Sequence, residues 1–430
     1  MRRLAFVFAP LLVAVASPAL AQEPPTANVA PEVSPAAQVT SASSPVESGP
    51  KSPPSTVTAA PAAPVKDPRP EPSAADKLGE LFDFENVAPP VGRAAPPTEA
   101  ATRGKGHVRA GLEVFAQYAL RDTAGATGEH TWFHTFDVPR VHVAVEGEWK
   151  EVRGRVLVEA TRSASEGALI GVAGDSLVLR VREAYAAYRP WKPLEISAGV
   201  IPTLTVPNLD GTWMMRPVAS SVMEANGFGT PADLGAKARV DVPGGYGFFA
   251  LAATNGEGYT NREQNRGKNV EALAEVHPLA GVSSTLSALG AFVSYSAGST
   301  GTGRAKANRL TGGLVWQGDR VRGGALVSHA WGLADLGTAR AMALSAFVRV
   351  EPVSRLYLGA RFDHVLRDLV SDASVPESTL STLIGSVGYR VVEPLETFVA
   401  VTRQVPTTRA RDEVPGSDFT ELKVVGRVVF

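Results

Sequence analysis

The stretch Phe419–Phe430, FTELKVVGRVVF, alternates between two kinds of residue up to the last position of the chain. Its even positions are apolar or glycine from residue 422 onward and include the final aromatic ring, whereas Glu421, Lys423 and Arg427 occupy odd positions. A period of two is typical of a β-strand. One apolar and one charged face suit a barrel wall between lipid and water, or equally the last strand of a soluble sandwich.

Composition excludes several classes of protein. The 430-residue chain has a formal net charge of -1, so bulk charge offers no attraction to nucleic acid and no nucleic-acid partner is expected. The chain contains no cysteine. Disulfides, thiolate metal sites, cysteine nucleophiles and a lipid anchor on a cysteine are therefore excluded.

The first 21 residues have the pattern of a secretory signal peptide. Arginines at positions 2 and 3 precede an apolar run over 4–15, and Ala19-Leu20-Ala21 forms a small-x-small cleavage site. No later stretch reaches the about 18 consecutive apolar residues that a membrane-spanning helix needs. We expect an exported protein, and a position within a membrane would require a barrel.

Residues 22–104 are rich in proline and alanine and hold too few large apolar groups to form a core. We predict a disordered tether in the periplasm, within reach of the cell wall. Residues 74–84 have the pattern of one short amphipathic helix, which the prolines from Pro89 onward would end.

Residues 105–430 are predicted to form an all-β domain, a transmembrane antiparallel up-and-down β-barrel of about sixteen strands. The connectors alternate between tight turns, such as 278–282, and longer polar segments, such as 332–338, as in barrels that have short turns at one end only. The predicted strands are 108–120, 131–149, 152–162, 177–189, 194–203, 232–242, 245–254, 269–277, 283–295, 308–317, 320–331, 339–350, 354–364, 379–390, 395–404 and 419–430.

If the apolar residues of each strand face the lipid, the charged residues of the same strand face the interior of the barrel. On the fourth strand this rule assigns both Glu183 and Tyr185 to the outer face. An arginine-rich interior would attract anions, or the arginines would pair with glutamates across strands and stiffen the wall; both interpretations stay open. The predicted lumen wall contains Arg140, Arg153, Arg155, Arg180, Arg182, Lys237, Arg239, Arg355, Arg361, Lys423 and Arg427.

The longest connector, 204–231, contains more large apolar residues than a freely solvated loop would. We expect it to fold inward against the barrel wall and narrow the pore. Asp210, Arg216 and Glu224 would then lie beside the path of a solute. A contact between subunits, or a lid over the mouth of the barrel, would also bury these apolar residues.

Three stretches resemble the phosphate-selective porin O/P family: 182–188 (REAYAAY), 194–202 (LEISAGVIP), and 255–259 (NGEGY) with Asn265 and Lys268. The resemblance covers about 108–430 and implies a sixteen-stranded, trimeric barrel whose third outer loop folds into the pore. Arg216 is the only basic residue in 204–231, whereas a dedicated phosphate constriction would carry several. A general or weakly anion-preferring porin is therefore expected.

We thus predict a porin in the outer membrane of a Gram-negative bacterium, in contact with lipid, that passes small hydrophilic or anionic solutes. The alternative is a structural or adhesive barrel with a closed pore. The seven histidines are spread along the chain with no serine or aspartate pattern beside them, and no Gly-x-Ser-x-Gly motif occurs, so no enzyme is expected. Nothing in the pattern calls for a metal or another cofactor.

Overall fold

The computed structural model describes residues 106–125, 127–162, 177–261, 263, 265–283, 285–333, 336–368 and 378–430. The predicted signal peptide at 1–21, the tether at 22–104 and the helix at 74–84 lie outside the described residues. Among the described residues, no helix combines the length and the apolar character needed to cross a membrane.

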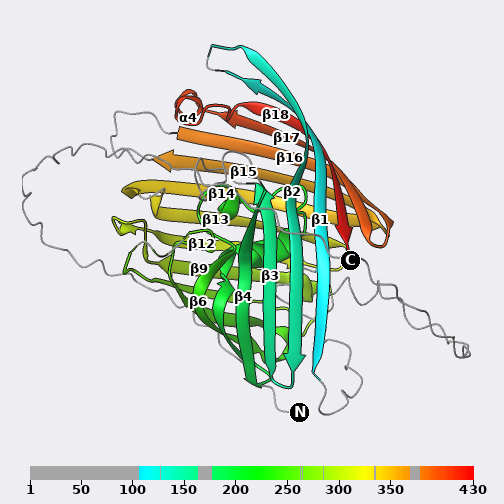
Figure 1. Ribbon diagram of the computed structural model, residues 1–430, viewed down its shortest axis with the longest axis vertical. Coiled ribbons are helices and arrows are strands. Elements are labelled where there is room, and N and C mark those ends of the chain that lie inside the picture. The colour runs from blue at the N-terminus through cyan, green and yellow to red at the C-terminus, as the bar shows by residue number, and fades with distance from the viewer. Residues whose placement is uncertain are drawn as a thin grey trace, which may run out of the picture. The chain divides into compact units, whose positions relative to one another are not determined.

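Sixteen antiparallel strands close into one barrel, which confirms the predicted fold (Figure 1). Each strand pairs with its neighbours in sequence, and the last pairs with the first. The strands are β1 (His107–Ala124), β2 (His130–Trp149), β3 (Val152–Arg162), β4 (Leu177–Trp191), β5 (Leu194–Pro202), β6 (Ala232–Val242), β7 (Gly247–Thr254), β8 (Asn269–Val276), β9 (Leu289–Ala297), β12 (Asn308–Gln317), β13 (Val321–Leu333), β14 (Leu336–Val353), β15 (Leu356–Asp368), β16 (Ser378–Val392), β17 (Leu395–Pro406) and β18 (Phe419–Val429). β10 (Ser299–Thr300) and β11 (Ala305–Lys306) form a separate two-stranded sheet.

The C-terminal stretch closes the barrel. β18 pairs with β1 from Glu113 opposite Val429 to Thr123 opposite Phe419. Beyond the strand, Phe430 and Leu112 exchange two backbone hydrogen bonds of 2.9 and 3.1 Å. Because every edge of the sheet is paired in this way, the barrel leaves no open strand edge along its seam.

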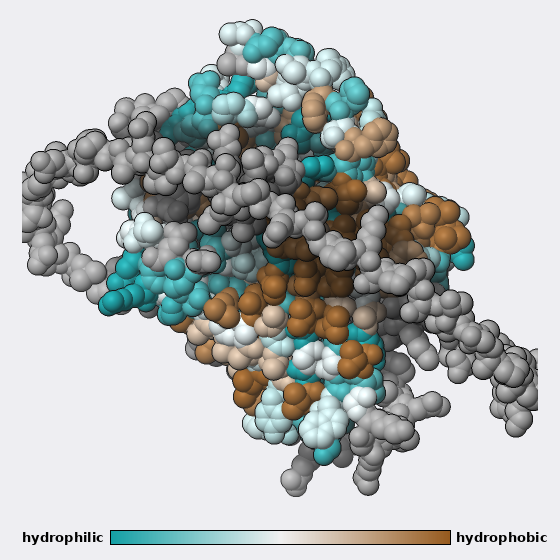
Figure 2. All heavy atoms as spheres, viewed as in Figure 1, coloured by the Kyte–Doolittle hydropathy of each residue, from teal (hydrophilic) through white to brown (hydrophobic). Residues whose placement is uncertain are grey.

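The two faces of the wall differ in polarity. On β15, Leu358 and Phe362 point outward and are 41% and 47% exposed, whereas Tyr357 and Arg361 point inward and are 1% and 4% exposed. Valine, leucine and aromatic side chains are exposed in this way on strands all round the barrel. Figure 2 shows hydrophobic residues gathered over the central part of one side, with hydrophilic residues above them. Such an outer face matches a hydrocarbon environment.

A β-bulge in β4 overturns two face assignments. Leu157 of β3 pairs with Glu183 but the next residue, Val158, pairs with Val181, so Arg182 is an extra residue. Arg182 and Glu183 are consequently both buried on the inner side. Tyr185, opposite Arg155, turns inward as well. The predicted outward positions of Glu183 and Tyr185 are wrong, because strict alternation does not survive an inserted residue.

Two connectors also differ from their predicted limits. The link from β8 to β9 covers 277–288 and includes the 3-10 helix η2 (Leu286–Ala288), so it is no tight turn and β9 begins at Leu289. The predicted connector 332–338, by contrast, is shorter than expected and covers only 334–335, because Leu333 pairs with Leu336. The other turns at the same end of the barrel as 150–151 are short. They include 192–193, 354–355 and the 3-10 helix η1 (Pro243–Gly245).

We predict that Leu383→Arg, on the outward face near the middle of β16, destabilises the barrel in lipid vesicles by about 2–4 kcal/mol. Leu383 is 57% exposed, so in a bilayer the new charge would lie in hydrocarbon. The measurement is guanidinium-induced unfolding followed by tryptophan fluorescence. The matched control is Thr382→Arg, one residue away on the inward face; an equal loss in both variants would contradict the assignment of faces.

Candidate functional site

The connector from β5 to β6 runs inside the barrel, where Figure 1 draws its two helices in green. The first helix, α2 (Thr205–Trp213), has every residue buried except Gly211, and the second, α3 (Val222–Ala225), buries Val222 and Met223. A helix buried on all sides cannot lie on the surface of a protein. The connector therefore occupies the lumen.

Apolar packing explains this position. Trp213 stacks edge-on against Phe347 of β14, with ring centroids 5.6 Å apart. The facing wall presents small side chains, including Ala330, Ala341 and Ala343, which leave room for the connector. The residues of the connector in this core are Val206, Leu209, Trp213, Met215, Val218, Val222, Met223 and Phe228. Burying this much apolar surface stabilises the inward fold over a solvated loop.

Glu271 on β8 holds the N-terminus of α2. Its carboxylate accepts hydrogen bonds from the backbone N–H groups of Leu204 and Thr205, each at 2.9 Å, and from the hydroxyl of Thr205 at 2.6 Å. The N-cap residue Leu204 has no side-chain acceptor of its own. A carboxylate from the wall thus satisfies the free N–H groups and the positive end of the helix dipole.

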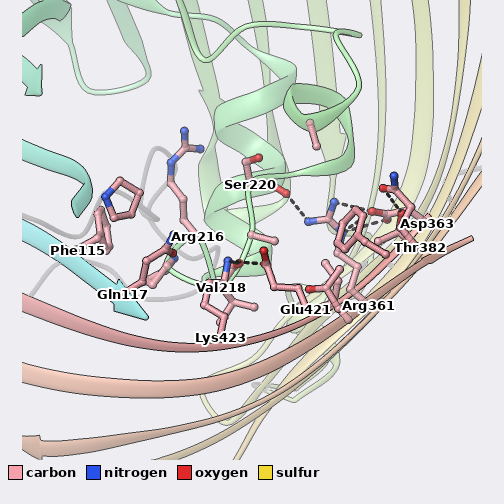
Figure 3. Close-up of a pocket in the computed structure, with 18 of the residues that line it drawn as sticks. Phe115, Gln117, Arg216, Val218, Ser220, Arg361, Asp363, Thr382, Glu421 and Lys423 are labelled. Carbon is pink, nitrogen blue, oxygen red and sulfur yellow. Dashed lines mark hydrogen bonds and ion pairs between the residues drawn. The ribbon is translucent and has the colours of Figure 1, made fainter. Parts of the chain in front are cut away.

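Basic side chains of the wall bind carbonyl oxygens of the connector. Lys423 donates to Val218 O at 2.7 Å and Arg361 donates to Ser220 O, and Figure 3 shows both side chains reaching toward the connector. Two further bonds are those from Arg309 to Phe228 O and from Arg322 to Gly211 O, both of 3.1 Å. Two residues of the predicted lumen wall, Lys423 and Arg361, therefore anchor the connector.

The structure brings Asp210, Arg216 and Glu224 together. The guanidinium of Arg216 donates a hydrogen bond of 2.8 Å to Oε1 of Glu224, lies 2.8 Å from Oε2 of the same carboxylate, and also pairs with Asp210. Arg140 of β2 reaches Glu224 at 3.3 Å. Burial alone would raise the pKa of Glu224, but Arg216 and Arg140 outweigh it and lower this pKa to about 2. Burial raises the pKa of Asp210, so Glu224 is the firmer counter-charge of Arg216.

From Arg140 the charged network continues along the wall. Glu159 pairs with Arg140 at 3.2 Å and with Arg182 at 3.4 Å, and accepts a hydrogen bond of 2.7 Å from Tyr259 in the connector 255–268. His142 joins Glu159 to Glu113 through contacts of 3.2 and 2.9 Å. Glu113 in turn pairs with Arg427 at 2.6 Å. Paired opposite charges thus run without a break from Arg427 on β18 to Arg140 on β2, which binds Glu224 of the connector 203–231.

Most of the other predicted basic wall residues are paired with carboxylates too. The pairs are Arg153 with Glu195 at 3.3 Å, Arg155 with Glu183 at 2.9 Å, Arg239 with Asp241 at 2.8 Å and Arg361 with Asp363 at 2.6 Å. Lys237 donates to the carbonyl of Pro202 at 3.3 Å, and Arg180 lies opposite Glu159 in the sheet. Arg355 is not on the wall: it is exposed in the turn 354–355, with a positive φ of 76°.

A cavity of about 360 Å³ lies between the connector and the wall formed by β1, β2 and β15–β18 (Figure 3). Its lining includes four basic residues, Arg140, Arg216, Arg361 and Lys423, and two acidic ones, Asp363 and Glu421. The formal charge of the lining is therefore +2. Polar side chains such as Gln117 and Thr382 complete a surface suited to water and small hydrophilic molecules.

Several residues of this site have no signal of their own in the sequence. Glu271 reads as an ordinary polar position of a strand, and the alternation pattern offers no reason to connect it with residues 204 and 205. Tyr259 belongs to the stretch NGEGY, which the resemblance singles out without a role. Within the described ranges, no group of three or more histidine, aspartate or glutamate side chains could hold a metal ion.

We predict that Arg216→Ala undocks the tip of the connector, since it removes the guanidinium between two buried carboxylates, a loss worth about 3–5 kcal/mol. Limited proteolysis of the folded barrel should then cut within the connector faster than in the unmodified protein. The triple variant Arg216→Ala, Asp210→Asn, Glu224→Gln removes the unpaired charges and should recover part of the protection. Unchanged protection in Arg216→Ala would contradict this account.

Solved barrels of the same architecture include the following three bacterial proteins. The structure of OmpF of Salmonella typhi in complex with daunomycin matches with a TM-score of 0.55 and 13% identity over 75% of this chain and 97% of that one. The anion-selective porin of Comamonas acidovorans matches with a TM-score of 0.54 and 9% identity over 76% and 100%. The outer membrane channel DcaP of Acinetobacter baumannii matches with 0.53 and 12% over 76% and 97%.

No protein-family model and no curated protein sequence matches this chain. At identities this low, the likeness to the solved structures establishes the fold alone. The fold is that of the sixteen-stranded porin barrels, and the resemblance to the phosphate-selective porin O/P family stays a prediction.

Proposed function

We propose that the protein is an outer-membrane porin of a Gram-negative bacterium that lets small hydrophilic solutes diffuse passively through its barrel. The observation that carries this proposal is a closed barrel with an apolar outer face and a charged, polar cavity of about 360 Å³ inside. An apolar exterior suits lipid, and a polar interior suits water. The inward connector 203–231 would act as the constriction.

The charges of the lumen favour a weak preference for anions. Because the arginines of the wall are largely paired with carboxylates, the wall as a whole is close to neutral rather than strongly basic. The cavity lining itself has a formal charge of +2, but Arg140 and Arg216 within it are paired with carboxylates outside the lining, so the preference for anions, including phosphate-type anions, would be weak. A mixed lining of this kind would discriminate less than a run of unpaired lysines and arginines.

A closed structural barrel is the second candidate. The observation in its favour is the depth at which Asp210 and Arg216 are buried: their side chains are 6% and 7% exposed, in a network that joins the connector to β2. If this network blocked the lumen, the barrel would carry no current. Bilayer recordings separate the two candidates.

We predict stable single-channel steps for the refolded protein in planar bilayers, with a reversal potential of the anionic sign under a salt gradient. Lys423→Gln should shift the reversal potential toward cations and Glu421→Gln toward anions, because both side chains line the cavity and carry opposite charges. A folded barrel without steps would support the closed structural candidate, and a clear cation preference would contradict the weak anion preference.

We further propose that three copies associate through the outer face of β1–β5. A hollow of about 440 Å³ lies there, and its lining holds Gly147, Gly154, Ala184, Ala186 and Ala198. Small residues let two backbones approach closely within a membrane. The outward faces of β14 and β16 include larger side chains, such as Leu344 and Leu383.

Ala186→Trp should lower the proportion of trimers that light scattering detects in detergent, because the indole ring would fill the hollow. Val327→Trp places the same ring on the outward face of β13 and is the matched control, expected to leave the oligomer unchanged. Equal effects of the two variants, or none from Ala186→Trp, would contradict an interface on β1–β5.

A further inference from the structure

A buried glutamate near the end of β8, Glu275, and the first residue of the connector 277–288, His277, form a pair beside helix α2. The side chains of His277 and Glu275 are both 0% exposed, and Nε2 of the ring lies 2.9 Å from Oε1 of the carboxylate. The other ring nitrogen, Nδ1, lies 3.0 Å from the carbonyl oxygen of Ser287. Carbonyl and carboxylate oxygens are acceptors, so both ring nitrogens carry a proton when both bonds form. The geometry is that of an imidazolium ion.

His277 is the counter-charge of Glu275. The carboxylate also accepts bonds from Asn208 at 2.8 Å and Gln317 at 3.4 Å, but both donors are neutral amides. In the described part of the chain, Glu275 forms no ion pair other than the one with His277. A buried carboxylate that loses its counter-charge is strongly destabilising. The proton on His277 therefore keeps this carboxylate compensated.

The other groups that face the pair are uncharged or are bound to other partners. β9 contributes the backbone of Gly290, where an added Cβ would lie 2.7 Å from Cε1 of His277, so only glycine leaves room for the ring. The connector contributes the carbonyl of Ser287. On β13, the cation Arg322 stands opposite Gln317 and donates to the carbonyl of Gly211. On β8 itself, the next carboxylate is Glu271, which binds the N-terminus of α2.

The pair is connected to the constriction through α2. Asn208 binds Glu275 directly, and Thr212, one turn later, accepts a bond of 3.1 Å from Gln317. Asp210, which pairs with Arg216, lies between these two residues on the same helix. Loss of the charge on His277 would therefore act on α2, which leads directly into the part of the connector that lines the cavity, including Arg216 and Val218.

We infer that His277 is a positioning residue that holds α2 against the wall while it is protonated and lets the helix detach when it loses its proton. At alkaline pH, Glu275 would be left buried without a counter-charge, and undocking of α2 would return the carboxylate to water. The passage would widen as a result. This inference deepens the proposed channel function and rests on it for its consequence, a pore whose width depends on pH.

His142 does not meet the same conditions, although it is also buried between two carboxylates. Glu159 is paired with Arg140 and Arg182, and Glu113 is paired with Arg427. Loss of a proton from His142 therefore leaves both carboxylates compensated by arginines. The structure assigns the proton-dependent contact to His277 for this reason.

The absence of cysteine from the chain allows a direct test. Val206→Cys places one thiol on the buried side of α2, and its rate of reaction with a small maleimide in the refolded full-length protein reports undocking. Each rate is divided by the rate for the urea-unfolded protein at the same pH, which removes the intrinsic pH dependence of the thiol. The normalised rate should rise by about tenfold between roughly pH 6 and pH 9.

Two variants in the Val206→Cys background should respond in opposite directions. His277→Gln leaves Glu275 uncompensated at every pH, so labelling should be fast at both ends of the range. Glu275→Gln removes the buried charge and should keep labelling slow at both ends. His134→Gln, an exposed histidine on β2, is the matched control and should keep the rise of the unmodified protein.

A labelling rate that does not depend on pH, or a rise that persists in His277→Gln, would overturn the inference. If His277→Gln fails to fold, the loss of the rise in Glu275→Gln still decides the question. The proposed channel function and the inference about His277 can fail independently. A pH-dependent labelling rate without bilayer current would refute the channel and leave the contact intact. Currents without a pH-dependent labelling rate would refute the contact alone.

Discussion

Burial of the apolar side chains of the connector 203–231 against an alanine-rich part of the wall determines where open space remains inside the barrel. Sixteen strands enclose an interior too wide for their own side chains to fill. Trp213 and its neighbours fill one side of it, because Ala330, Ala341 and Ala343 leave the space they need. The remaining space lies between the connector and the charged strands, and its lining combines residues of both.

Charge compensation follows from this packing. Once the connector lies inside, its carbonyl oxygens and carboxylates face the wall, and Lys423, Arg361 and Arg140 bind them. Most basic side chains of the predicted wall are bound in this way to carboxylates or carbonyl oxygens in the described part of the chain. A basic side chain that anchors the connector contributes less field to the surrounding space, so this packing reduces the unpaired positive charge inside the barrel.

Carboxylates of β8 also hold α2 at two points, its N-terminus and Asn208. Glu271 compensates the helix N-terminus with a carboxylate, and Glu275 holds Asn208 while His277 compensates its charge. Both glutamates come from β8, four residues apart on the inward face. One strand thus docks the helix through two carboxylates, of which Glu275 has a histidine as its partner.

The sequence by itself determined the barrel, its strand count and most inward and outward faces, because lipid on one side and water on the other impose a period of two that is readable in stretches such as 419–430. It also placed Asp210, Arg216 and Glu224 on an apolar connector. Only the tertiary structure decided which charges meet: Arg182 and Glu183 share a face through a bulge, and Glu271 finds a helix 66 residues away. Alternation is a local property, whereas ion pairing depends on strand register and loop position, which distant parts of the chain set together.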